Sequence, residues 1–154
     1  MDRATENSRR QHTELRRLAD HLLVLVEDDR PLDESAVQRV LSRLAGVLKM
    51  HVAMELEGLY PQLLAHPNEE VRTMASRMVE TVQGAYEGFL KFRTNWHAQA
   101  VHADQQTFAQ QARFIAKAFH ESTTREEQRL YDRVDAIYAE MARLSRPPIS
   151  AVGE

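Results

Sequence analysis

The sequence predicts an all-α protein with the architecture of an antiparallel up-down-up-down four-helix bundle. Three observations support this: long segments with apolar residues at helical spacing, only short links between them, and no segment that alternates with period two. The chain has 154 residues, the length of one domain, and 43% of them are hydrophobic and 28% charged, as in ordinary globular proteins. We assign residues 1–145 to the bundle and residues 146–154 to a C-terminal tail.

Four segments carry apolar stripes, at residues 5–28, 34–65, 69–97 and 105–145. Within each stripe the steps are mostly of three or four residues, so the apolar side chains form one continuous helix face. The stripes are Leu15, Ala19, Leu22 and Val26; Val37, Leu41, Leu44 and Leu48; Val71, Met78, Val82, Ala85, Phe89 and Trp96; and Phe108, Ile115, Phe119, Leu130, Val134, Ile137 and Met141.

The links between these segments are short and rich in residues that end or begin helices. Asp33, Asn68 and Asp104 are suited to cap the second, third and fourth helices, because their side chains accept hydrogen bonds from first-turn N–H groups. Pro147 and Pro148 end the last helix. The links are residues 28–33, 65–68 and 98–104, and links this short favour antiparallel neighbours.

Composition excludes several classes of protein. The chain has no Cys, which excludes disulfides, thiolate zinc sites, iron–sulfur clusters and a Cys nucleophile. Its net charge of −3 argues against a nucleic-acid or anionic-membrane partner. No apolar run approaches the ~20 residues that span a bilayer, and the N-terminus lacks the apolar core of a secretory signal. We therefore expect a cytoplasmic protein.

Polar residues interrupt the apolar stripes at one level of the predicted bundle. His12 continues the first stripe, His51 and Glu55 continue the second, and Ser122 and Glu126 fall within the fourth. His12 and His51 lie about equally far from the first link, and reflection through the other links brings Ser122 to the same height. Polar groups in a core are costly unless they are paired or bind a metal. Several of them at one depth predict a site.

The other histidines do not fit that site. His120 lies about 120° around the helix from Glu126, so we expect it to face solvent while Ser122 faces the interior. The third segment offers only Met78 and Val82 at this level. Solvated surface positions are expected for the remaining histidines, His21, His66, His97 and His102.

Two similar motifs occur at this level. The second segment has His51-x3-Glu55 followed by Leu-Tyr-Pro, and the fourth has Ser122-x3-Glu126 followed by Leu-Tyr. With the early His12 on the first helix, the pattern from about residue 8 to about residue 135 resembles the hemerythrin-like (HHE cation-binding) family. The segment HVAMELEGLYP is its most specific part.

That family is a four-helix bundle that holds an oxo-bridged di-iron pair with five His and two bridging carboxylates. Its members are associated with oxygen binding, iron or oxygen sensing, and iron handling.

The resemblance implies roles for individual residues. His12 matches the ligand on the first helix, and His51 matches the terminal ligand on the second. Glu55 matches the first bridging carboxylate, and Glu126, or its neighbour Glu127, matches the second.

The sequence also departs from the family pattern. Met78 and Val82 stand where the third helix would supply a His-x3-His pair, and Ser122 stands where the fourth would supply a His. All three missing imidazoles belong to the same iron. The remaining ligands suit a single Fe(II), Mn(II) or Zn(II), so the prediction is at most one metal ion, with a mononuclear site favoured over a di-iron one.

Three functions stay open at this point. The first is a metal-binding module that senses metal, O2 or another small oxidant. The second is a metal-free bundle that serves as a scaffold or interaction protein. The third, which we favour least, is an enzyme, such as a diiron-type oxidase or a reductase of nitric oxide or peroxide. Gly84 and Gly88 on the third helix add two alternatives, close approach of a neighbouring helix or a homodimer contact.

Overall fold

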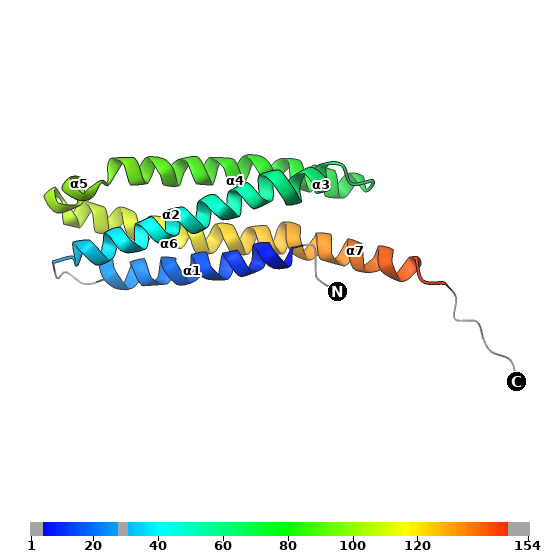
Figure 1. The fold of residues 1–154 in the computed structure, drawn as a ribbon, viewed down its shortest axis with the longest axis horizontal. Helices are drawn as coiled ribbons and strands as arrows, with labels where there is room; N and C mark the ends of the chain where they lie inside the picture. Colours follow the sequence, from blue (N-terminus) through cyan, green and yellow to red (C-terminus); the bar gives the residue numbers. More distant parts are fainter. Residues whose placement is uncertain (1–4, 28–30, 148–154) are drawn as a thin grey trace, which may run out of the picture.

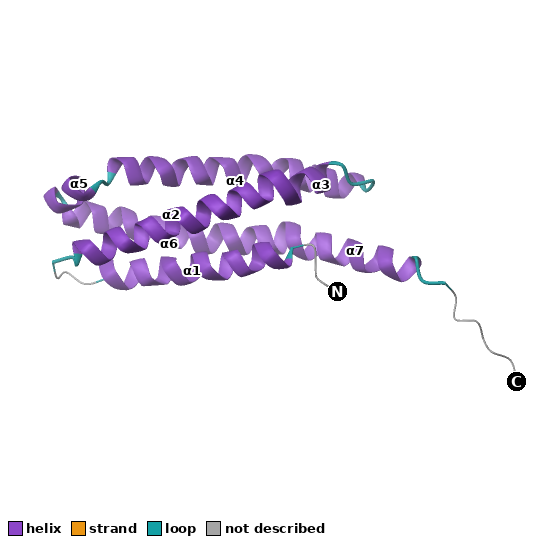
Figure 2. Ribbon diagram, viewed as in Figure 1, coloured by secondary structure: helices purple, strands orange, loops and turns teal. Residues whose placement is uncertain are grey.

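The computed structural model describes residues 5–27 and 31–147, and within them the chain is all helical with no strand (Figures 1 and 2). The predicted all-α class is therefore confirmed. Residue 28 of the first predicted segment and residues 148–154 of the predicted tail lie outside the described part. The long helices, which lie alongside one another in Figure 1, are α1 (Glu6–Val26), α2 (Glu34–Met54), α4 (Glu69–Asn95) and α6 (Gln105–Glu126).

Two of the long helices, α2 and α6, continue through a turn of π-helix. After α2 come a π turn, η1 (Glu55–Leu59), and α3 (Tyr60–Leu64); after α6 come η2 (Glu127–Tyr131) and α7 (Asp132–Leu144). In η1 the backbone N–H of Tyr60 donates to the carbonyl of Glu55, five residues earlier. Each π turn inserts one extra residue into the helix and changes which side chains share a face.

The helix ends follow the predicted caps. The side chains of Asp33, Asn68 and Asp104 each accept a hydrogen bond from a first-turn N–H group, at 2.8–3.1 Å. The third link was predicted as a loop, and this is wrong in part: it contains the short helix α5 (Ala98–Ala103). The ring of His97 caps α5 by accepting from the N–H of Ala100, an N-terminal signal that is easily missed because His is not a usual cap.

Most residues of the predicted stripes lie in the core, but Ala85 and Met141 of these stripes are exposed. Helix α1 packs against α2 and α6, and α2 packs against α4. Between α4 and α6 the core is incomplete, and a cavity lies there. Fully buried side chains of the core include Leu15, Leu22, Leu41, Leu44, Phe108 and Leu130.

The glycines of α4 do not serve a close helix contact. A Cβ atom placed on Gly84 or Gly88 would meet no heavy atom within 4 Å. The prediction that a neighbouring helix approaches closely there is therefore wrong, and the homodimer contact stays a prediction. In the described part of the chain, no helix combines the length and the apolar character that crossing a membrane requires.

Candidate metal centre

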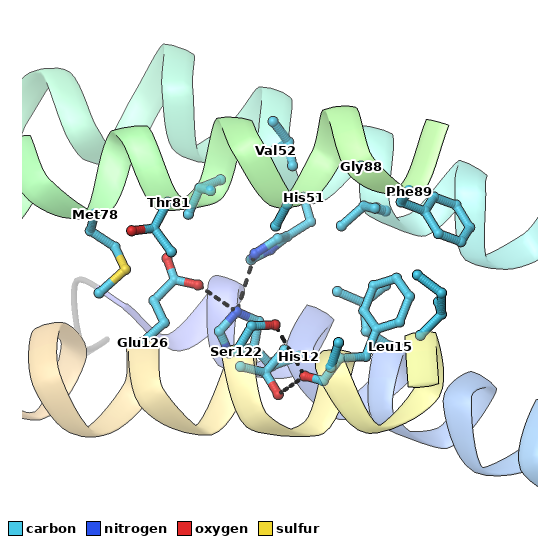
Figure 3. Close-up of a pocket in the computed structure, with 17 residues that line it drawn as sticks. His12, Leu15, His51, Val52, Met78, Thr81, Gly88, Phe89, Ser122 and Glu126 are labelled. Carbon is cyan, nitrogen blue, oxygen red and sulfur yellow. Dashed lines mark hydrogen bonds and ion pairs between the residues drawn. The ribbon is translucent and has the colours of Figure 1, made fainter. Parts of the chain in front are cut away.

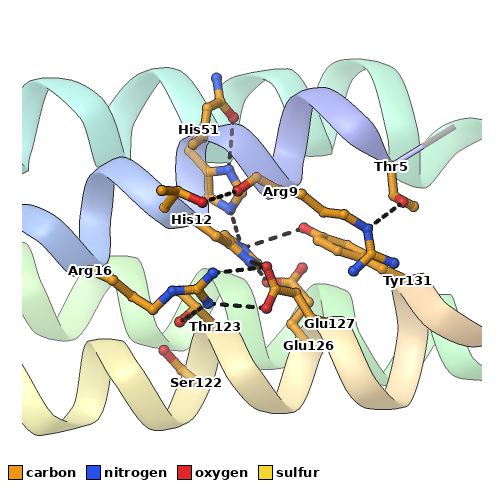
Figure 4. A network of polar contacts seen from close by, with 12 residues as sticks. Thr5, Arg9, His12, Arg16, His51, Ser122, Thr123, Glu126, Glu127 and Tyr131 are labelled. Atoms are coloured by element: carbon orange, nitrogen blue, oxygen red, sulfur yellow. Dashed lines mark hydrogen bonds and ion pairs between the residues drawn. The ribbon is translucent and has the colours of Figure 1, made fainter. Parts of the chain in front are cut away.

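Four polar side chains from different helices meet inside the bundle; Figures 3 and 4 label three of them, His12, His51 and Glu126. His12 comes from α1, His51 from the end of α2, Glu55 from the start of η1, and Glu126 from the end of α6. One ligand atom of each lies within 4.8 Å of the others, and all four residues are buried. The structure thus brings together the four residues that the stripe pattern placed at one level.

The distances within this cluster are short. His12 Nε2 lies 3.2 Å from His51 Nε2 and 3.2 Å from Glu126 Oε2. His51 Nε2 lies 3.3 Å from Glu55 Oε2. Two imidazole nitrogens and two carboxylates therefore converge on a volume the size of one cation.

The tautomer of His51 is set by a residue outside the cluster. His51 Nδ1 lies 2.8 Å from Gln11 Oε1, an oxygen that can only accept a hydrogen bond. Nδ1 therefore carries the proton, and the lone pair of Nε2 points into the cluster. A metal-binding imidazole needs this arrangement, in which its second nitrogen donates to a fixed acceptor.

A carboxylate and a guanidinium lie behind His12. Glu127 Oε1 is 3.3 Å from His12 Nδ1, although the geometry there is not that of a hydrogen bond. Arg16 holds Glu127 through two hydrogen bonds of 3.0 and 3.1 Å and also donates to Thr123 (Figure 4). Of the two adjacent glutamates that the sequence offered, Glu126 faces the cluster and Glu127 faces Arg16.

Two tyrosines donate to the carboxylates across the bundle. Tyr60 Oη donates to Glu126 Oε1 at 2.5 Å, and Tyr131 Oη donates to Glu55 Oε1. Each tyrosine follows a cluster glutamate by five residues on its own helix, with a π turn between them. The extra residue of each turn moves the tyrosine onto the face of the site, so each π turn supplies a donor to the carboxylate of the other helix.

Burial and mutual charge set the protonation of the metal-free cluster. Burial, with the charge of Glu126, raises the pKa of Glu55 to about 9. Burial also acts to raise the pKa of Glu126, but the hydrogen bond and charge of His12 outweigh it and hold this pKa below its ordinary value. Burial and the charge of His12 lower the pKa of His51 to about 4. At neutral pH Glu55 is therefore a neutral acid, His51 is neutral, and Glu126 is a carboxylate.

Two atoms of this region lack partners. Among the described residues, Glu55 Oε2 and His12 Nδ1 are buried and make no hydrogen bond, although Glu55 Oε2 lies 3.3 Å from His51 Nε2 and His12 Nδ1 lies 3.3 Å from Glu127 Oε1. A buried polar atom without a partner is costly, and coordination of a cation would satisfy Glu55 Oε2 directly. The donor set and this unpartnered oxygen fit a metal ion.

We expect Tyr60→Phe and Tyr131→Phe each to lower the free energy of unfolding by about 1–3 kcal/mol, because each leaves a buried carboxylate oxygen without its donor. Urea unfolding of the metal-free protein measures this loss. Tyr138→Phe is the matched control, since Tyr138 is 36% exposed and its loss should stay within about 0.5 kcal/mol. Equal losses in all three variants would contradict this role of the tyrosine hydroxyls.

The other polar residues considered in the sequence, His120, Ser122 and His66, lie in different surroundings. His120 points away from the cluster and pairs with Asp20 at 2.7 Å, and Ser122 is half-buried and lines the cavity between α4 and α6. His66 was predicted to be solvated, and this is wrong: it is 6% exposed. Its Nδ1 accepts from the N–H of Asn68, and its ring packs edge-on against Tyr138.

Sequence reasoning missed the residues around the cluster. Gln11 and Arg16 sit beside the first stripe, where polar residues are usually solvated. Tyr60 and Tyr131 were noted only as parts of a repeated Leu-Tyr pair. The spacing Glu-x4-Tyr, present in both helices, was the available signal.

Comparison with known proteins adds one finding. The family model of the hemerythrin HHE cation-binding domain matches residues 3–134, a range that contains all four cluster residues. No curated protein and no solved structure matches the chain. Because the match covers most of the chain, the protein belongs to the hemerythrin HHE cation-binding domain family.

Proposed function

We propose that this protein binds a single metal ion through His12, His51, Glu55 and Glu126. The observation that carries the proposal is the convergence of two imidazole nitrogens and two carboxylates within 4.8 Å in a buried site. His51 presents its lone pair to this site, and Glu55 Oε2 makes no hydrogen bond there. Such groups are stable together only when protons or a cation lie between them.

The donor set supports one ion of a particular kind. Imidazole and carboxylate ligands suit Fe(II), Mn(II) and Zn(II), and iron is the metal that we favour. Met78 and Val82 of α4 and Ser122 of α6 line the cavity beside the cluster, so this side supplies no imidazole or carboxylate for a second ion. We therefore infer at most one tightly held metal per chain.

The proposed role is the sensing of metal, O2 or another small oxidant in the cytoplasm. A bound iron would supply open coordination positions at which a small oxidant binds. The protein's own part is to hold the ion with fixed imidazoles and to shield it among apolar side chains. We also propose the up-down-up-down order of helices over residues 1–145, which the course of the chain in Figure 1 supports.

Elemental analysis tests this function. The protein is expressed with added iron, manganese and zinc, purified, and measured for metal per chain. About one ion per chain is expected. Two irons per chain would contradict the single site, and a protein that takes up no metal would favour the alternative, a metal-free scaffold whose cluster is held by hydrogen bonds.

We expect Gln11→Leu to weaken metal binding by about 10–100-fold, because His51 loses the acceptor that fixes its tautomer and ring orientation. Competition with a chelator of known affinity measures this change. Gln106→Leu, at an exposed position of α6, is the control and should bind as the wild type does. An unchanged affinity in Gln11→Leu would show that Gln11 does not orient the ligand.

A further inference from the structure

A cavity of about 290 Å³ lies beside the cluster, between α4 and α6 (Figure 3). His51 and Glu126 stand at its polar end. The rest of its wall is mostly apolar and includes Leu15, Leu48, Val82, Phe89, Ile115 and Phe119. It is therefore an apolar space with polar groups gathered toward one end, the usual arrangement of a small-molecule site.

The cavity is much larger than a diatomic ligand requires. A dry cavity of about 150 Å³ accommodates benzene, with its six carbon atoms. By that measure this cavity accommodates a molecule of up to roughly twelve non-hydrogen atoms. An organic ligand fits its volume better than a gas molecule does.

The charges of the wall exclude anions. Among the described residues that line the cavity there is no Lys or Arg, and Glu126 stands at the polar end. A carboxylate or phosphate group would lose its hydration there and face the carboxylate of Glu126, and His12 is already paired with Glu126 at 3.2 Å. The ligand that fits this wall is neutral.

The hydrogen-bonding groups of the wall are mostly acceptors. The hydroxyl of Thr81 donates to the carbonyl of Arg77, and that of Ser122 donates to the carbonyl of Phe119. Both hydroxyl oxygens keep a free lone pair, whereas Nε2 of His51 already faces Nε2 of His12 at 3.2 Å. The ligand must therefore bring the donor.

The geometry points to a binding site for a neutral, mostly apolar alcohol or phenol of up to about twelve non-hydrogen atoms. Its hydroxyl donates to Oγ of Ser122 near the polar end, and its hydrocarbon part lies against Phe89 and Phe119. This site does not depend on the metal, because Ser122 is not among the proposed metal ligands.

Calorimetric titration with 1-butanol, 1-hexanol and 1-octanol tests the site, on purified protein whose metal content is measured in the same sample. Each added methylene is expected to raise the affinity about fourfold, as burial of one CH2 does. In a sample without metal, octanoate at neutral pH should bind at least tenfold more weakly than 1-octanol because it is an anion. 2-Octanone should bind about fivefold more weakly because it lacks the donor.

Two glycines provide a matched pair of variants. Gly88 lines the cavity and Gly84 does not, yet both are exposed on α4 and have open space around the position of a Cβ. Gly88→Leu places a side chain in the cavity and should weaken 1-octanol binding at least tenfold, whereas Gly84→Leu should change it less than twofold. Both replace a helical glycine, so both should fold at least as stably as the wild type.

Three results would overturn the proposal: an affinity that does not rise with chain length, octanoate or 2-octanone binding as tightly as 1-octanol, or Gly88→Leu binding like Gly84→Leu. Its failure is distinguishable from failure of the metal proposal. A sample without metal that binds 1-octanol supports the cavity site alone, and a metal-loaded sample that does not bind it contradicts the cavity site alone.

Discussion

His51→Ala is expected to weaken metal binding by more than about 100-fold. Loss of a group that only orients a ligand costs 10–100-fold, and His51 is one of just two imidazoles in the cluster. His51 is 3% exposed, and no other imidazole among the described residues that line the cavity beside it, apart from the ligand His12, can replace it. Competition with a chelator of known affinity, run separately for Fe(II), Mn(II) and Zn(II), measures the change.

The matched control for His51→Ala is His120→Ala. His120 is also an imidazole at this end of the molecule, but it pairs with Asp20 at the surface and takes no part in the cluster. It should bind metal as the wild type does. If the two variants lost affinity equally, the metal would lie elsewhere, and the proposed ligand set would be wrong.

Metal should also stabilise the fold strongly. A ligand that binds only the folded state, at a free concentration of 100 Kd, adds about 2.7 kcal/mol to the free energy of unfolding. For a chain of this length that corresponds to a rise in Tm of roughly 5–10 °C. Coordination also satisfies the unpartnered Glu55 Oε2, which acts in the same direction.

Calorimetric melting with and without metal measures this rise. At the metal concentration used for the wild type, His51→Ala should rise by no more than about 2 °C, because it binds metal more than about 100-fold more weakly. A Tm that does not move in the wild type at saturating metal, or that moves equally in His51→Ala, would contradict the proposed coupling between metal and fold.

The fold was largely predictable because apolar periodicity is a strong signal over long helices. The stripes identified the four long segments, and the caps at Asp33, Asn68 and Asp104 placed three of their starts. The π turns could not be predicted in this way. One inserted residue offsets the later part of the stripe by a single position, and a stripe with both three- and four-residue steps hides this offset.

The candidate site could be predicted for side chains at core positions of a stripe. It could not be predicted for side chains at the edge of a helix, because their contacts depend on how far they extend toward neighbouring helices. His12 and His51 occupy core positions of their stripes, so their inward direction followed from phase alone. Gln11 and Arg16 lie at the edge of the same helix, where only the neighbouring helices decide whether a polar side chain meets solvent or the site. The cavity could not be predicted from the sequence either, because its size depends on the distance between α4 and α6.

Crystallographic anomalous scattering at the iron absorption edge tests the central claim most directly. The protein is reconstituted with Fe(II) and crystallised, and the anomalous difference map locates every ordered iron. We predict one peak per chain, about 2.0–2.2 Å from the Nε2 atoms of His12 and His51 and bordered by Glu55 and Glu126. Two peaks, or a single peak away from these four side chains, would contradict the account.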